Sequence, residues 1–295
     1  MSMKEHKIPF SDKLAYWLIR SIIFFVRILP KSWIYVFMQF ISVTFYKFSK
    51  RRRMITVDNL EKAFPGKDQT EIENLSKEVY ISLSETISEI LFMLADTFDI
   101  DAVVINKDEA LSKLKALQEE GTVGRIVMTA HFSNWELAAH FLAKHGYPML
   151  AVGREGDNQE IDQRLTLPFR EKYGNRSVYK KRVAIAILKT LKRGDIVGVL
   201  IDQKVGSEDG VKVQFFERDV YTTSIVAIMK QKLNVMVVPI FLPRVGRGKY
   251  KLIVGDPIKE NSDVVTMTQC YNDAIEEVVR AYPEQWFWMH NRWKV

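Results

Sequence analysis

Short apolar runs alternate with helical patterns over residues 126–281, and this alternation constrains the fold more than any other feature of the chain. The apolar runs predict strands at 126–130, 149–152, 196–201, 235–241 and 250–254. The segments between and after them predict helices up to 144 and at 159–173, 183–193 and 264–281, and a long amphipathic helix at 71–95 precedes them. Such alternation is typical of an α/β fold with a largely parallel central sheet flanked by helices.

The size of the chain predicts one main domain with an N-terminal appendage. Its 295 residues, 47% of them hydrophobic, suffice for one sizeable core. We expect a membrane-anchoring segment at 1–53 and an α/β domain at 54–295, without internal repeats. The single cysteine, Cys270, excludes an intrachain disulfide, which fits a cytoplasmic environment.

Charge is concentrated in the N-terminal segment. Residues 1–53 hold eleven Lys and Arg against two acidic residues, a net charge of +9, whereas the whole chain carries +7. A basic segment on a mildly acidic body indicates contact with anionic lipid head groups. A protein that binds the phosphate backbone would also carry a basic face on its body, so no nucleic-acid partner is expected.

Two apolar stretches in this segment predict membrane association. Residues 14–29 are interrupted only by Arg20 and Arg27, which share one helical stripe and indicate an interfacial helix. The uncharged run 32–46 would be about 22 Å long as a helix, against a hydrocarbon core of about 30 Å. We predict two helices that lie in or dip into one leaflet. The alternatives are one tilted span over 33–48, or packing of both helices on the core. A cleaved signal peptide is not expected, because no small-residue cleavage pattern follows the apolar run.

The segment at 131–136, with the sequence HFSNWE, places an imidazole and a carboxylate at a strand-to-helix junction. Positions five apart in a continuous helix differ by about 140°, so His131 and Glu136 can meet only if His131 lies in the turn. Ser133 and Glu136 have the spacing of a capping box, which would start the helix at Ser133 and leave His131 before it. The alternative is that Glu136 only closes this box and His131 is an ordinary loop histidine.

A histidine–carboxylate pair has a defined use in acyl transfer. A neutral histidine that accepts the proton of an attacking hydroxyl typically contributes about 10²- to 10⁴-fold to the rate. A carboxylate on its other ring nitrogen fixes the tautomer and stabilises the imidazolium. We therefore predict His131 as general base and Glu136 as the group that orients it. His140 and His145 supply no metal-ligand spacing with His131, so neither a metal nor a cofactor is expected.

Polar residues also follow other predicted strands. Ligands of open α/β sheets bind beyond the carboxyl ends of the strands, where we expect Arg154, Asp202 and Arg244. Arg154 is suited to a bidentate grip on a phosphate or carboxylate, or else it is a solvated arginine paired with Glu155. Asn158 either supports that loop or caps the next helix.

The remaining candidates lie farther along the chain. Asp202, followed by Gln203, either organises the acceptor site, holds a basic partner, or is a plain helix cap or turn residue. In the C-terminal segment, His290 and Arg292 either contact an anionic substrate or form a basic rim. The aromatic residues near Phe215 either line an acyl groove or belong to the core.

Residues 131–136 resemble the H-x4-D/E motif of the glycerolipid acyltransferase superfamily, and in particular the late acyltransferases of lipid A biosynthesis, the lauroyl and myristoyl transferases. The resemblance extends through RRRMITVDNLEKAFP at 51–65, GREGDN at 153–158, LKRGDIVGVLIDQ at 191–203 and PEQWFWMHNRWK at 283–294. Two positions depart from the family pattern: Asn291 replaces a usual basic residue, and a glycine common near Glu217 is absent.

The resemblance implies a glycerolipid-acyltransferase-like fold and an enzyme at the cytoplasmic face of the bacterial inner membrane. It implies transfer of a fatty acyl group from acyl carrier protein or coenzyme A to a hydroxyl of a lipid A precursor, with Arg154 near the acceptor head group. The glycerolipid branch usually carries a Glu-Gly-Thr-Arg type motif where this chain has Asp202, Gln203 and Lys204, which favours lipid A. A lysophospholipid or another glycolipid is the alternative acceptor, and a non-catalytic lipid-binding protein is the alternative class.

Overall fold

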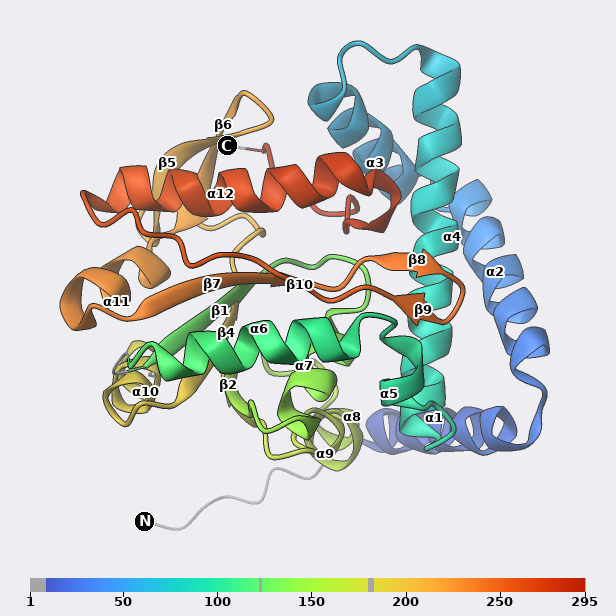
Figure 1. Ribbon diagram of the computed structural model, residues 1–295. Coiled ribbons are helices and arrows are strands. Elements are labelled where there is room, and N and C mark those ends of the chain that lie inside the picture. Colours follow the sequence, from blue (N-terminus) through green and yellow to red (C-terminus); the bar gives the residue numbers. More distant parts are fainter. Residues whose placement is uncertain (1–8, 122–123, 180–182, 295) are drawn as a thin grey trace.

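A mostly parallel sheet forms the centre of the molecule, in a computed structural model that describes residues 9–121, 124–179 and 183–294 (Figure 1). Its six strands have the order β10-β7-β1-β4-β2-β3. All neighbouring strands are parallel except β10, which runs antiparallel to β7. The strands are β1 (Arg125–Thr129), β2 (Met149–Gly153), β3 (Arg176–Tyr179), β4 (Ile196–Leu200), β7 (Met236–Phe241) and β10 (Ile253–Val254). The predicted α/β class and parallel sheet are confirmed.

Helices cover both faces of this sheet, which explains why its strands read as continuous apolar runs. On β1, Ile126 and Met128 pack in the same core as Tyr271, whereas Val127 packs in a second core with Phe141. The first core contains α10 (Val183–Lys192), α11 (Ile225–Leu233) and α12 (Val264–Ala281), and the second contains α5 (Ile100–Val103), α6 (Lys107–Glu119) and α7 (Trp135–Lys144). Figure 1 shows α12 and α6 on opposite sides of the sheet.

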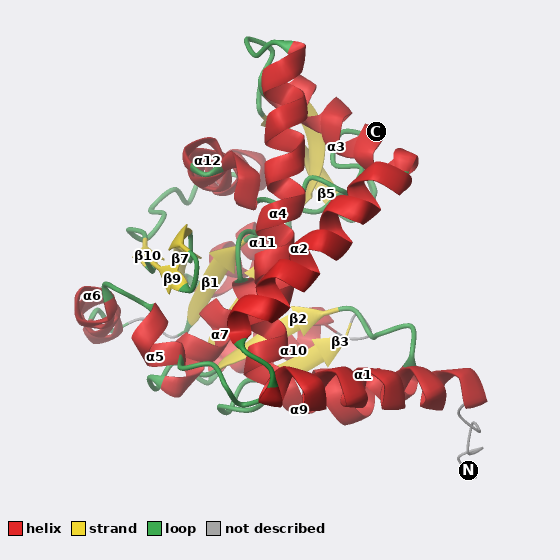
Figure 2. Cartoon of the chain, turned by 90° about the vertical axis from the view of Figure 1, so that its right-hand side faces the viewer, coloured by secondary structure: helices red, strands yellow, loops and turns green. Residues whose placement is uncertain are grey.

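The N-terminal part of the chain begins with the helices α1 (Phe10–Ile28), α2 (Lys31–Phe48), α3 (Lys50–Ala63) and α4 (Gln69–Leu94), which come before α5 and α6. A capping box between Asp68 and Glu71 starts α4, and α2 lies along α4 (Figure 2). The predicted boundary at residue 53 falls inside α3, so the basic run 51–53 is part of a helix. The first eight residues of the predicted anchoring segment lie outside the described residues. Among the helices described, none has the length and apolar composition needed to cross a membrane.

Some predicted elements differ from those observed. The predicted strand at 250–254 is divided between β9 (Lys249–Tyr250) and β10, and β9 pairs with β8 (Arg244–Gly246). The division falls at Leu252, because its backbone N–H and carbonyl are both hydrogen-bonded to the side chain of Asn106. The helical pattern at 159–173 becomes α8 (Gln159–Ile161), a π-helical turn (Asp162–Thr166) and α9 (Leu167–Arg170).

Residues 210–223 form a hairpin that was not predicted from the sequence. It consists of β5 (Gly210–Phe215) and β6 (Arg218–Thr223), joined by Phe216 and Glu217 at φ values of 53° and 57°. Two consecutive residues at positive φ are typical of tight hairpin turns, where glycine is favoured. The turn therefore lies where the resembling family often carries glycine. After α12, a short 3₁₀ helix (Pro283–Gln285) leads into the aromatic C-terminal segment.

Candidate active site

His131 lies in the turn between β1 and α7, as the spacing required. The predicted helix start is wrong by one residue, because α7 begins at Trp135 and its N-cap is Asn134, whose Oδ1 accepts the backbone N–H of Leu137 at 3.0 Å. Ser133 has a left-handed conformation with φ 51° and donates its backbone N–H to the carbonyl of Gln285 at 2.7 Å. Ser133 therefore belongs to the turn that carries His131 and does not cap the helix.

The carboxylate bonded to His131 is Asp202. The Asp202 Oδ1 atom lies 2.8 Å from His131 Nδ1, and Asp202 Oδ2 accepts the backbone N–H of His131 at 2.9 Å. A third donor, the indole N–H of Trp286, reaches the same Oδ2 at 2.8 Å. An ionised carboxylate only accepts hydrogen bonds, so Nδ1 carries the proton and Nε2 keeps a lone pair. Gln203 Nε2 lies 3.3 Å from His131 Nε2.

Electrostatics favour an ionised Asp202 and a basic His131. Burial opposes the ionisation of Asp202, but the charge of His131 and its side-chain and backbone hydrogen bonds outweigh that effect and hold the pKa of Asp202 well below its usual range. Burial likewise acts to lower the pKa of His131. The Asp202 charge, its hydrogen bond and then the Glu136 charge outweigh that effect and raise the pKa of His131.

Glu136 is engaged elsewhere, so the observed pairing differs from the predicted one. Arg170 donates from Nε and Nη2 to Glu136 Oε1 at 3.0 and 2.8 Å. Glu136 lies in the first turn of α7, from which its side chain meets Arg170 on α9. Asp202 follows β4, which pairs directly with β1, and this register brings Asp202 level with His131. Arg170 was not singled out from the sequence, because it lies 34 residues from Glu136 along the chain and no local pattern pairs the two.

A cavity of about 430 Å³ opens beside His131, between α7 and the sheet. Its polar wall includes Glu136, Arg170 and Gln203. Its apolar wall is formed by small and aliphatic side chains, among them Val127, Ala138, Leu142, Met149, Ala151 and Ile240. A second hollow of about 250 Å³ shares Val127, Leu142 and Ile240 with it. The two hollows therefore adjoin at these side chains, and their apolar parts are together called the apolar passage.

Gly198 is required in the floor of this cavity. A Cβ atom at this position would lie 2.4 Å from Met149 Sδ, well inside van der Waals contact. The absence of a side chain in the middle of β4 lets Met149 fold across the strand. Gly198 therefore helps to set the width of the passage.

Of the two binding residues predicted at 153–158, Arg154 lines the cavity, whereas Asn158 is not among its described lining residues. Arg154 is exposed, lines the cavity, and binds Asp157 at 2.7 Å; its carboxylate partner is thus Asp157 and not Glu155. Asn158 caps α8, since its Oδ1 accepts the backbone N–H of Ile161 at 2.9 Å, and its amide donates to the carbonyl of Asp12 at 3.3 Å. The capping alternative therefore describes Asn158.

The C-terminal candidates are more buried than expected. Arg292 is only 2% exposed and donates to the carbonyls of Gln203 and Tyr221 at 3.1 and 2.9 Å and to Thr222 Oγ1 at 2.6 Å. These acceptors from the hairpin and the 203 segment hold the guanidinium inside the protein, and the predicted contact of Arg292 with an anionic substrate stays a prediction. Burial also lowers the pKa of Arg292 to about 10.

His290 lies near Asp202 and His131, and burial lowers its pKa to about 4. Its Nε2 atom is buried and has no hydrogen-bond partner among the described residues. His290 is therefore neutral at pH 7, and it packs on the Trp286 ring with centroids 5.1 Å apart.

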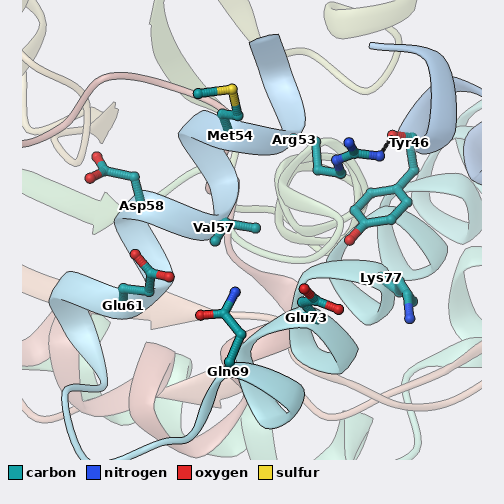
Figure 3. A pocket seen from close by; sticks show the side chains of 9 residues that line it. All are labelled: Tyr46, Arg53, Met54, Val57, Asp58, Glu61, Gln69, Glu73 and Lys77. Atoms are coloured by element: carbon teal, nitrogen blue, oxygen red, sulfur yellow. Dashed lines mark hydrogen bonds between the residues drawn. The ribbon is translucent and has the colours of Figure 1, made fainter. Parts of the chain in front are cut away.

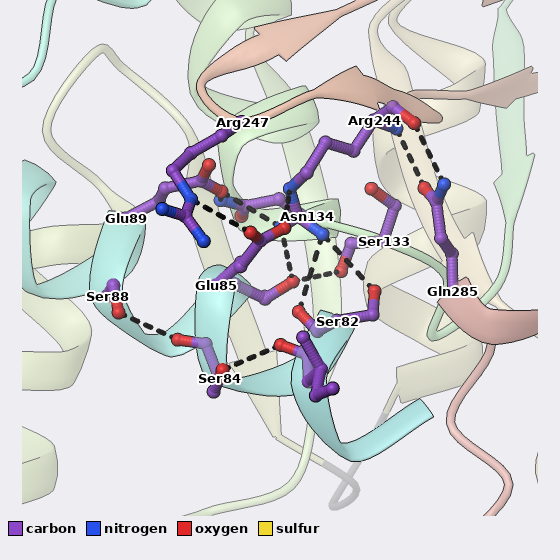
Figure 4. A network of polar contacts seen from close by, with 12 residues as sticks. Ser82, Ser84, Glu85, Ser88, Glu89, Ser133, Asn134, Arg244, Arg247 and Gln285 are labelled. Atoms are coloured by element: carbon purple, nitrogen blue, oxygen red, sulfur yellow. Dashed lines mark hydrogen bonds and ion pairs between the residues drawn. The ribbon is translucent and has the colours of Figure 1, made fainter. Parts of the chain in front are cut away.

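Arg244 turns away from the cavity into a buried polar network (Figure 4). Its Nη2 atom lies 3.0 Å from Glu89 Oε2, and the hydroxyl of Tyr250 also donates to Glu89. Asn134 donates to the same Glu89 oxygen at 3.4 Å, so the network reaches the turn that carries His131. Arg244 therefore has a structural role in this buried network.

A larger hollow of about 560 Å³ lies between α2, α3 and α4 (Figure 3). Its described lining is rich in charged side chains of both signs: Arg53, Asp58, Glu61, Glu73 and Lys77. None of its described lining residues belongs to the cavity beside His131. The two hollows are therefore separate features of the molecule.

A histidine held by a buried carboxylate, at the carboxyl ends of parallel strands and beside an apolar cavity, is the arrangement of an enzyme with a general base. The sequence model of the bacterial lipid A biosynthesis acyltransferases matches residues 3–295. The chain belongs to this family and is an acyltransferase of lipid A biosynthesis. The resemblance predicted from its motifs is thus confirmed.

Individual relatives agree with this assignment. The lipid A biosynthesis lauroyltransferase of Escherichia coli (strain K12) is 25% identical over 285 residues, which cover 94% of this chain and 90% of the relative. The lipid A biosynthesis palmitoleoyltransferase of the same organism is 26% identical over 261 residues, covering 84% and 80%. A lipid A biosynthesis acyltransferase of Haemophilus influenzae is 22% identical over 247 residues, covering 82% and 75%.

Proposed function

We propose that this protein transfers a fatty acyl group from an acyl thioester to a hydroxyl of a lipid A precursor, with His131 as general base. One observation carries the proposal: Asp202 holds His131 Nδ1, which leaves Nε2 as a proton acceptor beside an apolar cavity. The raised pKa of His131 makes it a stronger base than a free histidine.

The reaction follows from this geometry. His131 Nε2 accepts the proton of the acceptor hydroxyl as the hydroxyl oxygen attacks the thioester carbonyl. Asp202 stabilises the imidazolium that forms. When the tetrahedral intermediate collapses, the carbon–sulfur bond breaks and Nε2–H returns the proton to the leaving thiolate. Backbone N–H groups at the start of α7 face the developing oxyanion and stabilise it.

The apolar passage holds the acyl chain of the donor. Its aliphatic wall and its second hollow match a long hydrocarbon tail, which contributes about 0.8 kcal/mol for each buried CH₂ group. The polar groups lie at the His131 end, where the thioester and the acceptor hydroxyl meet. The apolar and polar walls therefore separate the two substrates.

Glu136 and Arg170 serve the polar end of this cavity. The Glu136 charge supports the basicity of His131, and Arg170 keeps that carboxylate in place. Arg154, exposed at the mouth, exchanges Asp157 for a phosphate of the acceptor or of the donor. Gln203, close to His131 Nε2, orients the acceptor hydroxyl. The donor is a thioester of acyl carrier protein or coenzyme A.

The exposed side chains of α1 and α2 support membrane association, and Figure 2 shows how the two helices are placed in the chain. Both helices leave large apolar side chains exposed, among them Phe10, Leu14, Trp17, Leu18, Phe24, Phe25, Ile28, Trp33, Val36, Phe37, Phe40, Phe45 and Phe48. The basic residues of this segment complement anionic lipid head groups. The two helices lie at the cytoplasmic surface of the bacterial inner membrane, where the lipid acceptor and a water-soluble thioester donor are both accessible.

Mass spectrometry of the products tests this function. The purified full-length protein in detergent is given acyl carrier protein or coenzyme A thioesters with either a tetra-acylated lipid A precursor or a lysophospholipid. We expect the lipid A precursor to gain the mass of one acyl group. Acylation of the lysophospholipid alone would contradict the proposed acceptor, and no transfer to either acceptor would contradict the proposed reaction.

A further inference from the structure

The C-terminal segment is built into the turn that carries His131. The carbonyl of Gln285 accepts the backbone N–H of Ser133 at 2.7 Å, and the backbone N–H of Phe287 donates to the carbonyl of His131 at 3.0 Å. Phe132 and Trp286 form an antiparallel bridge between these two hydrogen bonds. Residues 285–287 therefore form a strap along the catalytic turn.

Trp286 completes the set of donors around Asp202. Its indole is only 1% exposed, and its N–H donates to Asp202 Oδ2 at 2.8 Å. The backbone N–H of His131 donates to the same oxygen at 2.9 Å, so the hydrogen bond with His131 Nδ1 is made by the other carboxylate oxygen, Oδ1. Two donors on one oxygen fix the rotation of the carboxylate about its Cβ–Cγ bond.

The surroundings hold the indole itself. Trp286 meets the rings of Trp288 and Phe215 with centroids 4.7 and 5.4 Å apart. The side chain of Gln285 brackets the backbone of Arg244, accepting its N–H at 2.7 Å and donating to its carbonyl at 2.8 Å. The indole N–H therefore points at Asp202 from a rigid support.

We propose that Trp286 is a positioning residue of the transferase, which fixes the Asp202 carboxylate so that Oδ1 holds His131 Nδ1. The proposal rests on the proposed function, in which His131 is the base. Trp286 touches neither His131 Nε2 nor the reacting atoms and acts through Asp202. Without its N–H, one buried carboxylate oxygen loses a donor, and the carboxylate turns to recover a partner.

The consequence for His131 has a definite sign. Four charged or titratable groups act on the His131 ring from the packed elements: Asp202 after β4, Glu136 on α7, Arg170 on α9 and His290 in the C-terminal segment. Asp202 is the strongest of those that stabilise the imidazolium. A turned Asp202 carboxylate stabilises the imidazolium less, so the His131 pKa falls.

A titration of His131 in Trp286→Phe tests the proposal without any substrate. Phenylalanine keeps a buried ring and removes only the N–H. The protein has five histidines, so NMR of the full-length, histidine-labelled chain in detergent identifies His131 by its loss in His131→Gln. We expect the His131 pKa to fall by about one unit in Trp286→Phe. We also expect kcat for acyl transfer to fall by about ten-fold with KM unchanged.

Two further variants separate positioning from general stability. Trp293→Phe removes another buried indole N–H, which donates to the carbonyl of Phe215 at 3.1 Å, and should leave the His131 pKa and kcat unchanged. Asp202→Asn lowers the His131 pKa without disturbing the aromatic stack, and Trp286→Phe should add little in that background.

An unchanged His131 pKa in Trp286→Phe would overturn the proposal, as would effects of Trp286→Phe and Asp202→Asn that simply add. Failure of the wild type to transfer acyl groups would instead reject the proposed function, because the titration does not depend on it. If Trp286→Phe does not fold, Trp286→Leu, which also lacks the N–H, takes its place: a lowered His131 pKa supports the proposal, and an unchanged one overturns it.

Discussion

The two ring nitrogens of His131 differ in their surroundings. Nδ1 is bound by Asp202, and the proposed reaction assigns Nε2, beside the cavity, to the acceptor hydroxyl. The position of His131 in a strand-to-helix turn was predictable, because the apolar run before it and the helical pattern after it are local features. The partner was not predictable, because the choice between Glu136 and Asp202 depends on the pairing of β1 with β4.

The first prediction compares the two carboxylates. Asp202→Asn should lower kcat by about 10²- to 10⁴-fold, because the amide no longer selects the tautomer or stabilises the imidazolium. Glu136→Gln removes only a charge that acts on His131 from its salt bridge with Arg170, and should cost about ten-fold. Steady-state kinetics of both variants decide this. A larger loss of kcat in Glu136→Gln than in Asp202→Asn would indicate that Glu136, and not Asp202, orients His131.

The second prediction concerns the stability of the fold below neutral pH. His290 has a folded pKa of about 4 against an ordinary 6.5, so the unfolded chain binds more protons between these values. The free energy of unfolding should therefore fall as the pH drops from about 6.5 to about 4, with a slope of at most about 1.4 kcal/mol per unit.

Replacement of the imidazole isolates this contribution. His290→Phe keeps the ring contact with Trp286 and removes the titrating group, so the slope between these pH values should flatten. Chemical denaturation at several pH values measures it. His131 has a raised pKa, so the stability it contributes is lost only as the pH rises above 6.5, outside this window. An unchanged slope in His290→Phe would contradict the account.

At the scale of elements, α4 supports the active-site turn through the buried network of Figure 4. Glu89 on α4 binds Arg244 and lies 3.4 Å from the amide of Asn134, the N-cap of α7. The helical pattern of α4 was readable from the sequence. The pairing of Glu89 with Arg244 was not, because 155 residues separate them along the chain.

The third prediction is therefore a difference between two arginines. Arg244→Met leaves the buried Glu89 without its cation and should destabilise the fold by about 3–5 kcal/mol. The matched control Arg247→Met breaks a half-exposed pair with Glu85 and should cost at most about 1 kcal/mol. Thermal and chemical unfolding of both variants measures the difference. Equal losses would show that the network does not stabilise the fold.

Local sequence patterns did not predict the exact ends of some helices or the contacts between distant residues. Helix α7 begins at Trp135 because Gln285, far along the chain, binds the backbone of Ser133 and removes it as a cap. The helix predicted at 159–173 is present over 159–170 but contains a π-helical turn, and the contact of Arg170 with Glu136 joins residues 34 positions apart in the sequence. Tertiary contacts thus decide the ends of helices and the residues that meet at the site.

At the scale of the whole molecule, the exposed apolar faces of α1 and α2 give the protein one distinctive surface. The apolar runs and the basic charge of residues 1–53 made these helices predictable, and their ends at Ile28 and Phe48 lie close to those expected. The division of the chain at residue 53 was not readable in the same way, because the basic run continues into α3.

The fourth prediction concerns binding to vesicles. The triple variant Trp17→Ser, Phe24→Ser, Trp33→Ser should lower binding to anionic phospholipid vesicles at least ten-fold, since each buried aromatic ring contributes about 1.5–3 kcal/mol. Added salt should weaken binding of the wild type, because the basic residues of 1–53 then attract the surface less.

The control uses exposed apolar residues outside this surface. Ile185→Ser on α10 and Val265→Ser on α12 should leave vesicle binding unchanged in a flotation assay. Equal losses in both sets of variants would indicate nonspecific adsorption and contradict the assignment of α1 and α2 as the membrane surface.

The central claim is that His131 takes the proton of the acceptor hydroxyl. Its most direct test compares the rates at which the wild type and His131→Ala transfer an acyl group to a tetra-acylated lipid A precursor. The rates are measured by mass spectrometry, and both proteins are first shown to be equally well folded. The account predicts that His131→Ala folds like the wild type and loses about 10²- to 10⁴-fold in rate. Transfer by His131→Ala at the wild-type rate would contradict it.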